Sequence, residues 1–409
     1  MKSHFSRGVL RSMLAAALAV GAAPVWGQFP GGPLPASPLA GGSAAASGGQ
    51  FMDASGNPII MPTQYCEPAG SYGGPTGADG GACYGGGGGC GDGSEAYADF
   101  GGYSQPDQCG PHYFDVSTQA LALQGEQLFG SAPALGSIGV QGDKILDPKN
   151  TYNDYEAGWQ IAARHDFGPL SVLEATYFGI YNLGFNDTVR SVDVAPGGDD
   201  FQLNSVFSNY GVAPIDGLDE GSVYSLNYKA NLQSTELSYR RYWVGFNPRI
   251  SGTYLVGARY LRLAETLAFN TVALNGSGSI TSRGYNDMVG FQFGGDGWIA
   301  LRQGLRIGTE LKSGIYNNSY EFNRSATFPN VATTAVQNGD NVAFAGEASL
   351  DMVADILPSW SIRGGYRVLY MDNLATVGNN IPATLTATTI GSKADALFHG
   401  FQFGVEYVW

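Results

Sequence analysis

The chain closes on FHGFQFGVEYVW, residues 398–409, in which large apolar side chains strictly alternate with small or polar ones for most of the stretch. A period of two is the period of a β-strand and not of a helix. One face of this strand carries Phe401, Phe403, Val405, Tyr407 and Trp409, and the other carries Gly400, Gln402, Gly404, Glu406 and Val408. The pattern fits a soluble β-sandwich, and it equally fits a barrel that has lipid outside and polar contents inside.

Nine further alternating segments precede this one. They are 113–123, 155–167, 169–182, 223–244, 249–269, 283–301, 305–322, 342–356 and 360–371. We therefore predict an all-β fold, a closed antiparallel up-and-down transmembrane β-barrel of ten strands, with twelve as the alternative count. The fourth segment loses its phase near Gln233, which predicts a bulge or two separate pieces.

The lengths of the connections favour the barrel over the sandwich. Tight turns join the second segment to the third, the fourth to the fifth, the sixth to the seventh and the eighth to the ninth. The other connections are long: 124–154, 183–222, 270–282, 324–341 and 372–396. Short turns at one rim and long loops at the other are typical of outer-membrane barrels, and an even strand number puts both chain ends at the short-turn rim.

The composition of the two strand faces supports the same fold. The charged faces are rich in glycine, which weakens an ordinary strand but makes room for long charged neighbours in a narrow barrel. The apolar faces end on aromatic residues, as expected for girdles at the two lipid interfaces. The candidate girdle residues are Trp243, Tyr366, Tyr370, Tyr407 and Trp409.

The amino terminus predicts export. Three basic residues precede an apolar stretch, 13–26, and Val25 and Gly27 fit a small-residue cleavage pattern before Gln28. We interpret residues 1–27 as a signal peptide, since the apolar run is shorter than the roughly 18–20 residues of a membrane anchor. Its removal takes the net charge from −14 to −17, which argues against a nucleic-acid partner.

Residues 28–111 form a Gly/Pro/Ser/Cys-rich extension that can bury little apolar surface and is expected to be flexible. An even number of cysteines in an exported chain favours disulfides, although their pairing cannot be read from the sequence. The candidates are Cys66, Cys83, Cys90 and Cys109. A metal site is the alternative, but the spacing from Cys83 to Cys90 does not fit paired ligands.

Together, the extension, the strand-rich region 112–409, and the stretches SVLEATYFGIYN (171–182) and FHGFQFGVEYVW resemble the β-barrel porin family numbered seven, bacterial outer-membrane beta-barrel proteins. The resemblance covers residues 113–409. It implies an integral outer-membrane barrel without an assigned substrate. Family knowledge of barrels further implies that the aromatic end of the terminal strand is read by the barrel insertion machinery.

Charged residues on the predicted inner faces form a candidate network in the lumen. They are Glu156, Arg164, Asp166, Glu174, Glu236, Arg240, Arg259, Arg306, Glu310, Lys312, Glu347, Asp351, Asp355, Arg363, Arg367 and Glu406. Because eight strands are about filled by side chains and 16–18 leave a channel, ten strands predict a lumen largely filled by ion pairs. A narrow pore lined by the same groups is the alternative.

No enzyme is expected. A ten-stranded outer-membrane protease would need an Asp-His pair and further acids at the outer rim, and only His399 with Asp395 offers such a pair. No G-x-S-x-G motif or P-loop is present. We predict no catalytic, cofactor or metal residues.

The connection 183–222 is the preferred surface for a partner. Its acids are Asp187, Asp193, Asp199, Asp200, Asp216, Asp219 and Glu220, against a single Arg190. Carboxylates can hold Ca²⁺, but no twelve-residue calcium loop is present, so solvated charge is the preferred interpretation.

We expect a structural or surface protein of the bacterial outer membrane, or a narrow passive diffusion pore, with the extension in the periplasm and membrane lipid as its partner. The alternative function is a soluble secreted β-protein that binds or adheres through acidic loops.

Overall fold

The computed structural model describes residues 114–130, 132–151, 154–168, 170–247, 249–357, 359–382 and 390–408. The predicted signal peptide, the predicted extension with its four cysteines, and Trp409 lie outside the described residues. No helix among the described residues is long and apolar enough to cross a membrane.

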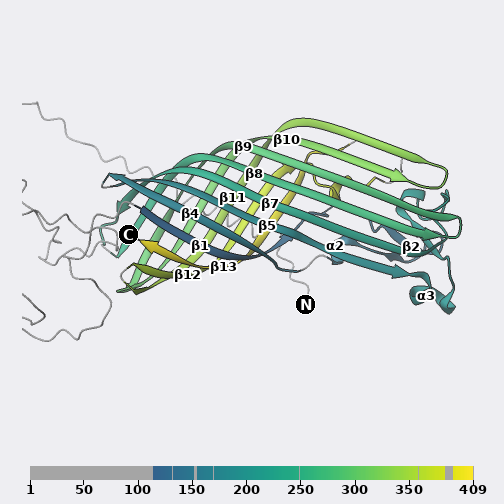
Figure 1. Cartoon of the computed structure of the whole chain (residues 1–409), viewed down its shortest axis with the longest axis horizontal. Helices are drawn as coiled ribbons and strands as arrows, with labels where there is room; N and C mark the ends of the chain where they lie inside the picture. Colours follow the sequence, from purple (N-terminus) through teal and green to yellow (C-terminus); the bar gives the residue numbers. More distant parts are fainter. Residues whose placement is uncertain are drawn as a thin grey trace, which may run out of the picture. The chain divides into compact units, whose positions relative to one another are not determined.

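Ten long strands form an antiparallel ring (Figure 1). They are β1 (Phe114–Glu126), β4 (Glu156–Gly168), β5 (Ser171–Arg190), β7 (Gly221–Val244), β8 (Ile250–Ala273), β9 (Gly276–Arg302), β10 (Leu305–Thr327), β11 (Ala332–Leu357), β12 (Trp360–Leu374) and β13 (Ala394–Val408). Each pairs with two neighbours, and the β7–β8 and β1–β13 ladders join segments that complete the ring. The ten predicted strands are therefore confirmed as the strands of the ring.

The remaining elements lie in the connections at one end of the ring. They are β2 (Gly136–Ile138), β3 (Lys144–Ile145), α2 (Pro148–Thr151), α3 (Ser191–Val194), η2 (Pro196–Gly198), β6 (Leu203–Ser205), η3 (Val206–Ser208) and η4 (Gly378–Asn380). The three short strands pair with one another and with β7, which makes a sheet of thirteen strands. We call the end that carries these connections the outer end, and the opposite end, with the tight turns, the turn rim.

The strands differ in length, and this corrects two predicted loops. β1, β4, β12 and β13 have 13–15 residues, whereas β5 and β7–β11 have 20–27. The predicted long connections 270–282 and 324–341 are wrong: the β8–β9 and β10–β11 hairpins continue through them and turn only at 274–275 and 328–331. The ladder continues there while the outward-facing side chains become polar, so the apolar pattern ends before the strand does.

The bulge predicted near Gln233 is also wrong. β7 is continuous, and its even-numbered residues from Tyr224 to Arg240 are all buried. What changes near Gln233 is the character of the side chains: Tyr228 and Leu232 point inward on one side of it, and Glu236 and Arg240 point inward on the other. A register shift does occur in the neighbouring strand, between Ile180 and Leu183.

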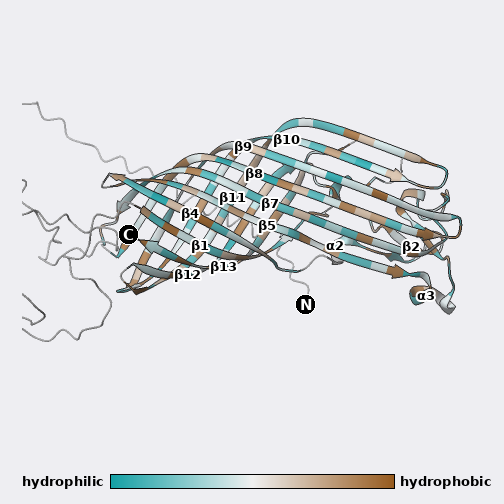
Figure 2. Ribbon diagram, viewed as in Figure 1, coloured by the Kyte–Doolittle hydropathy of each residue, from teal (hydrophilic) through white to brown (hydrophobic). Residues whose placement is uncertain are grey.

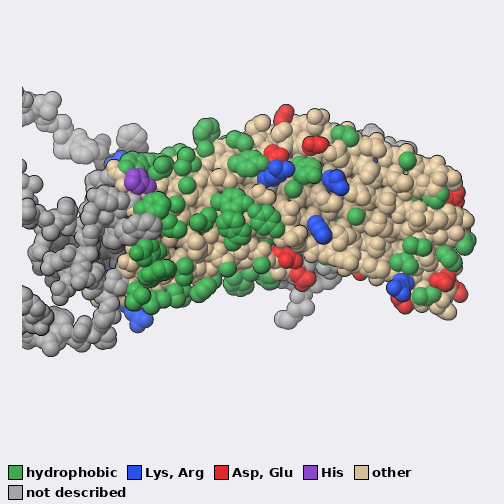
Figure 3. Space-filling model, in the orientation of Figure 1, with side chains coloured by type: hydrophobic (Ala, Val, Ile, Leu, Met, Phe, Trp, Pro, Cys, Tyr) green, Lys and Arg blue, Asp and Glu red, His purple; other side chains and the backbone are tan. Residues whose placement is uncertain are grey.

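The half of the ring next to the turn rim is apolar on its outer surface. Alternating hydropathy along the strands is visible in Figure 2, and Figure 3 shows the hydrophobic side chains gathered over this half. The most exposed members on β9 and β13 are Val289, Phe291, Phe293, Phe401 and Phe403, at 58–79%. We call this surface the apolar band.

Rings of aromatic residues follow the edges of the apolar band. Near the turn rim, Trp360 stacks on Tyr407 at 4.8 Å between ring centroids, and Trp243 lies 6.0 Å from Tyr254. At the other edge Tyr366 packs edge-on against Phe401, at 5.2 Å. Such positions suit side chains with an apolar body and a polar tip.

The outer half of the ring has the opposite arrangement, with an apolar interior. Inward residues of the long strands, such as Leu226, Leu263 and Phe322, are fully buried. They pack with buried residues of the connections, including Leu135 and Phe207. The connections thus cover the inner face of the long strands where the short strands have already ended, and we call this packing the outer core.

Candidate functional site

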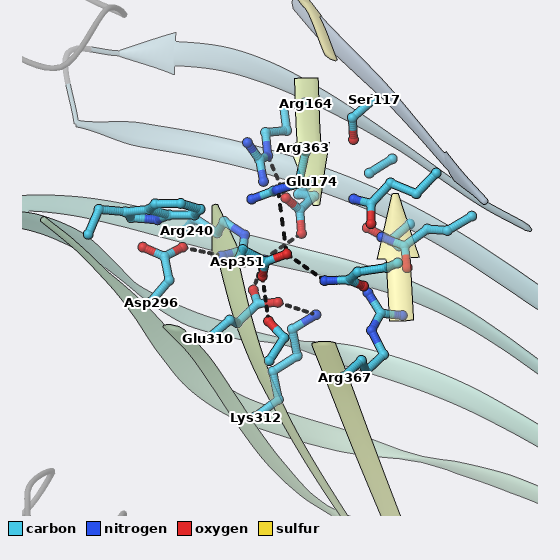
Figure 4. Close-up of a pocket in the computed structure, with 17 residues that line it drawn as sticks. Ser117, Arg164, Glu174, Arg240, Asp296, Glu310, Lys312, Asp351, Arg363 and Arg367 are labelled. Atoms are coloured by element: carbon cyan, nitrogen blue, oxygen red, sulfur yellow. Dashed lines mark hydrogen bonds and ion pairs between the residues drawn. The ribbon is translucent and has the colours of Figure 1, made fainter. Parts of the chain in front are cut away.

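A continuous chain of charged side chains crosses the interior behind the apolar band. It runs in the order Glu406, Arg164, Glu174, Arg240, Glu310, Lys312, Glu236, Arg259, Glu347, Arg367, with N–O distances up to 3.6 Å. Acid and base alternate at every step. The ten groups come from eight strands of the ring, so the chain of ion pairs ties opposite walls together. Figure 4 shows the part of this chain that runs from Arg164 to Lys312.

Arg240 is the most connected member of this network. Its guanidinium lies 2.7 Å from Glu174 Oε1 and 2.9 Å from Asp296 Oδ2, and it also donates to Glu310. Asp296 in turn accepts bonds from Thr253 N and Thr253 Oγ1 at 2.9 and 2.8 Å. Only 3% of Arg240 is exposed. A buried charge needs such partners, because an unpaired one would carry a large desolvation cost.

The second part of the network is centred on Glu236 and Glu347. Glu236 accepts from Lys312 Nζ and pairs with Arg259 Nε, both at 3.2 Å. Glu347 pairs with Arg259 Nη2 at 2.8 Å and with Arg367 Nε at 3.4 Å. Each carboxylate therefore bridges two cations from different strands, which fixes the long side chains across the lumen.

Glycines in the wall make room for these long side chains. A Cβ at Gly365 would lie 2.5 Å from Asp351 Oδ1, and one at Gly404 would lie 2.6 Å from Gln119 Cγ. Glycine thus makes room for a charged side chain at Gly365, as predicted, and for an uncharged one at Gly404. Between the ion pairs remains a small cavity of about 30 Å³.

Three glutamines line this cavity beside the ion pairs. The side-chain oxygens of Gln119, Gln160 and Gln402 are buried and have no hydrogen-bond partner among the described residues. Gln402 donates from its nitrogen to Asp351 Oδ1. Water or a small polar solute in the cavity would be positioned to satisfy these oxygens.

The cavity ends at an aromatic layer where the outer core begins. The guanidinium carbons of Arg259 and Arg367 lie 5.8 and 5.5 Å from the ring centre of Phe178. Beyond Phe178, the interior is filled by apolar side chains such as Leu121 and Leu369. The polar lumen is therefore closed toward the outer end.

A segment of the β12–β13 connection is held inside the outer core by polar groups of the wall. Asn286 donates to Ala375 O at 3.1 Å and accepts from Ala375 N at 2.8 Å. Glu265 accepts from Val377 N at 3.1 Å and from Tyr228 Oη at 2.7 Å. These buried polar residues satisfy the inserted backbone, which would otherwise lack partners in an apolar environment.

Ten of the sixteen residues predicted for the lumen network take part in its continuous chain of ion pairs, and two more, Asp351 and Arg363, form a separate, long pair at 3.9 Å. The other four lie apart. Arg306 stacks on Trp298 at 5.6 Å, and Asp355 accepts from Ser361 Oγ at 2.6 Å. Asp166 lies at the turn-rim end of β4 and Glu156 at its opposite end.

Sequence reasoning missed several buried polar residues of the interior. Asp296 is a direct partner of Arg240, and Asp115 is 5% exposed on β1. The alternation contains the signal for both: Asp296 follows Gln292 and Gly294 on one face of β9, and Asp115 precedes Ser117 and Gln119 on one face of β1. Glu265 was missed because its neighbours on the same face are leucines.

His399 does not lie with the interior charges. Its Nδ1 is 2.6 Å from Tyr366 Oη, and its Nε2 is 3.2 Å from Glu126 Oε1, so its partners are these two residues and not Asp395. Among the described residues, no group of three His, Cys, Asp or Glu could hold a metal ion.

The acidic connection predicted as 183–222 is shorter in the structure, 191–220, because β5 continues to Arg190, and it is more ordered than the expected solvated loop. Asp219 is 4% exposed and accepts from Ser205 N, Ser208 Oγ and Ile215 N at 2.6–2.9 Å. Burial raises the pKa of Asp219 above its usual value, while these three hydrogen bonds act against the rise. Solvated charge is therefore the wrong interpretation for Asp219, whereas Asp193, Asp199 and Asp200 are exposed.

No family model matches the chain, so the resemblance to the porin family numbered seven is not confirmed. No curated protein matches it either.

Solved outer-membrane proteins resemble the structure only distantly. The outer membrane protease OmpT from Escherichia coli has 10% identity and a TM-score of 0.41, over 73% of this chain and 97% of its own. A major outer membrane protein from Thermus thermophilus has 9% identity and a TM-score of 0.29, over 73% and 100%. The translocator domain of autotransporter NalP from Neisseria meningitidis has 12% identity and a TM-score of 0.33, over 72% of this chain and 88% of its own. These values are too low to assign a function.

Proposed function

We propose that the chain is an integral β-barrel of the bacterial outer membrane with a structural or surface role. The observation that carries the proposal is the inverted polarity of the turn-rim half, where large apolar side chains cover the outside and ion pairs fill the inside. Only helices and closed barrels can span lipid, because every backbone group there must be paired within the protein. The ring of ten ladders meets that requirement.

The dimensions of the short strands agree with this proposal. Strands of 13–15 residues, tilted by about 45°, would cover roughly 30 Å, which is enough for an apolar band of about 25 Å. The additional length of the long strands would then stand outside the membrane. There their outer surface is largely polar, with isolated exposed valines such as Val272 and Val336.

The alternative function, a soluble secreted β-protein, is disfavoured by the same surface. Phe291 is 79% exposed and Phe401 is 59% exposed, within a continuous apolar band. A large contiguous apolar surface of this kind would promote aggregation in water unless a membrane or a partner covered it.

A closed lumen supports the structural role over transport. The ion-pair chain crosses the cavity, and the outer core fills the interior beyond Phe178. A narrow diffusion pore is the second candidate, favoured by the glutamine oxygens that face the polar cavity without a protein partner among the described residues. We further propose that the turn rim and the 28–111 extension face the periplasm, that the insertion machinery reads β13, and that the chain has no catalytic activity.

Membrane fractionation and conductance test the proposal together. The expressed chain should be found with outer membranes, require detergent for extraction, and migrate differently in gels before and after heating. In planar bilayers it should add no steady conductance. A stable ohmic conductance would favour the pore instead, and a chain that remains monomeric in buffer without detergent would overturn the membrane assignment.

A further inference from the structure

Three basic side chains lie on the outer surface of β7–β9, beyond the apolar band. Lys229 on β7 and Arg283 on β9 both pair with Thr266 on β8, so Lys229, Thr266 and Arg283 form one row across the three strands. With strands about 4.8 Å apart, the Cα atoms of Lys229 and Arg283 lie about 10 Å from each other. Arg262 faces outward four residues nearer to the band along β8. We call the three side chains of Lys229, Arg262 and Arg283 the basic patch.

The basic patch lies beyond the outer edge of the apolar band: Arg262 is two residues beyond the row of Tyr260 and Val289, and Lys229 and Arg283 are six residues beyond it. Val289 and Phe291 on β9 are 60% and 79% exposed, and Val256 on β8 is 55% exposed. On β9, the next outward residue after Val289 toward the outer end is the polar Asp287. Figure 3 shows Lys and Arg side chains gathered where the hydrophobic surface ends on this face.

Tyr260 marks the outer edge of the apolar band, and Tyr285 lies within the basic patch, between the rows of Arg262 and Arg283. Tyr260 pairs with Val289 across the β8–β9 ladder, and Tyr285 lies two positions beyond Asp287. The guanidinium carbon of Arg262 lies 5.6 Å from the ring centre of Tyr285. Tyrosine at such a boundary is typical of the interface between hydrocarbon and headgroups.

Among the described residues, acidic neighbours pair with only one of the three basic residues of the patch, Arg262, so Lys229 and Arg283 can still bind an anion. Arg262 pairs with Asp287 at 3.6 Å, and Asp287 also accepts from Tyr260 Oη. Glu321 borders the patch on β10, opposite Tyr285, and accepts a hydrogen bond from Asn323. Lys229 and Arg283 are exposed and form no ion pair with any acidic residue that the structure describes.

We propose that the basic patch binds the phosphate groups of anionic lipid headgroups in the leaflet at the outer edge of the apolar band. This inference rests on the proposed membrane location. Acyl chains would cover Val256, Val289 and Phe291, so the headgroup region would begin at the height of Arg262 and extend outward toward Lys229 and Arg283. Clustered Lys and Arg beside a membrane surface attract anionic lipids at a level of several-fold in affinity per residue.

Native mass spectrometry of the full chain, extracted in mild detergent and titrated with lipid A, tests the inference. The triple variant Lys229→Gln/Arg262→Gln/Arg283→Gln should retain lipid A at least about tenfold more weakly than the wild type. The matched control is Arg190→Gln/Arg249→Gln/Arg302→Gln, which removes the same charge from exposed residues at the outer tip of β5 and at the turn rim. This control should retain lipid A like the wild type.

Equal retention by the triple variant and the wild type would overturn the inference, and so would an equal loss in the control. Inorganic phosphate that displaces lipid A at low concentration would also overturn it, since it would identify a free-anion site. Phosphatidylcholine should bind the wild type and both variants equally. Heat-modifiable migration of the triple variant shows separately whether the membrane location itself holds.

Discussion

The two halves of β7 have opposite polarity on the same strand. In the outer half Leu226 and Tyr228 point inward and Lys229 points outward, whereas near the turn rim Arg240 points inward and Leu237 points outward. The strand period does not change between them. The comparison teaches that solvent on each side, and not strand geometry, selects the side chains: water surrounds the outer half, and lipid is proposed to surround the other.

The two halves also differ in what fills them. The outer core is built like that of a soluble protein, from close-packed apolar side chains and connections folded over the sheet. The turn-rim half is filled by ion pairs that bridge opposite walls. Substitutions of the same kind should therefore have different effects in the two halves, which the leucine truncations and the surface charges below test directly.

The largest effect is expected for Arg240→Met. It leaves Glu174, Asp296 and Glu310 without their shared cation and should lower the free energy of unfolding by about 3–5 kcal/mol. Urea titration of the barrel inserted in vesicles measures this loss. The adjacent Arg241 is exposed on the outer surface, so Arg241→Met is the control and should change stability little. Equal effects would contradict a stabilising role of the interior ion pairs.

The second largest effect is expected for truncation of a leucine, which should lower the free energy of unfolding more in the outer core than in the apolar band. Leu263 is fully buried in the outer core, and Leu263→Ala should cost about 2–5 kcal/mol through the lost contacts and the cavity left behind. Leu237 is 53% exposed in the apolar band, so Leu237→Ala leaves no internal cavity. The same urea titration compares the two variants, and a larger loss for Leu237→Ala would break the distinction.

A charge placed on the outer surface should be tolerated in only one half. Phe291→Arg exposes a cation within the apolar band and should destabilise the inserted barrel by about 2–4 kcal/mol. Ser325 faces outward on the outer part of β10, and Ser325→Arg should have almost no effect. The yield of heat-modifiable protein after insertion into vesicles measures both. If Phe291→Arg inserts like the wild type, the apolar band does not face hydrocarbon.

The smallest effect concerns pH and the connection held by Asp219. Because its pKa is raised in the folded state, the folded chain binds the proton more tightly than the unfolded chain. Stability from this group is therefore greatest at low pH and falls as pH rises from the ordinary carboxyl pKa through the raised one. Hydrogen exchange at the amides of Ser205 and Ile215, corrected for intrinsic rates, should show less protection above that range, by less than about 1 kcal/mol. Asp219→Asn should flatten this dependence, and unchanged protection in both would refute it.

Much of the fold could be predicted because alternation is a local property of each strand. The ten ring strands and the tight turns follow from it directly. The outer ends of the strands could not be predicted in this way. Residues 270–282 and 324–341 lose the apolar outward pattern while their backbones stay paired. The loss of alternation near Gln233, from which the bulge was predicted, has the same origin: the surroundings of the side chains change along an unbroken strand.

The candidate site was predicted as faces but not as contacts. The inward positions of Arg240 and Glu174 follow from strand period, yet their meeting with Asp296 and Glu310 depends on which strands the ring places opposite one another. Asp219 illustrates the same limit, because its burial results from a connection that folds back on itself.

The sequence by itself determined the strand segments, the inward and outward faces near the turn rim, and the excess of charge on the inward faces, because each depends on residues two apart. The tertiary structure decided that the long strands continue beyond the apolar band, that the connections fill their inner face, and that ions from opposite walls pair. Those features depend on residues far apart in the chain, whose distance is set only when the ring brings the strands together.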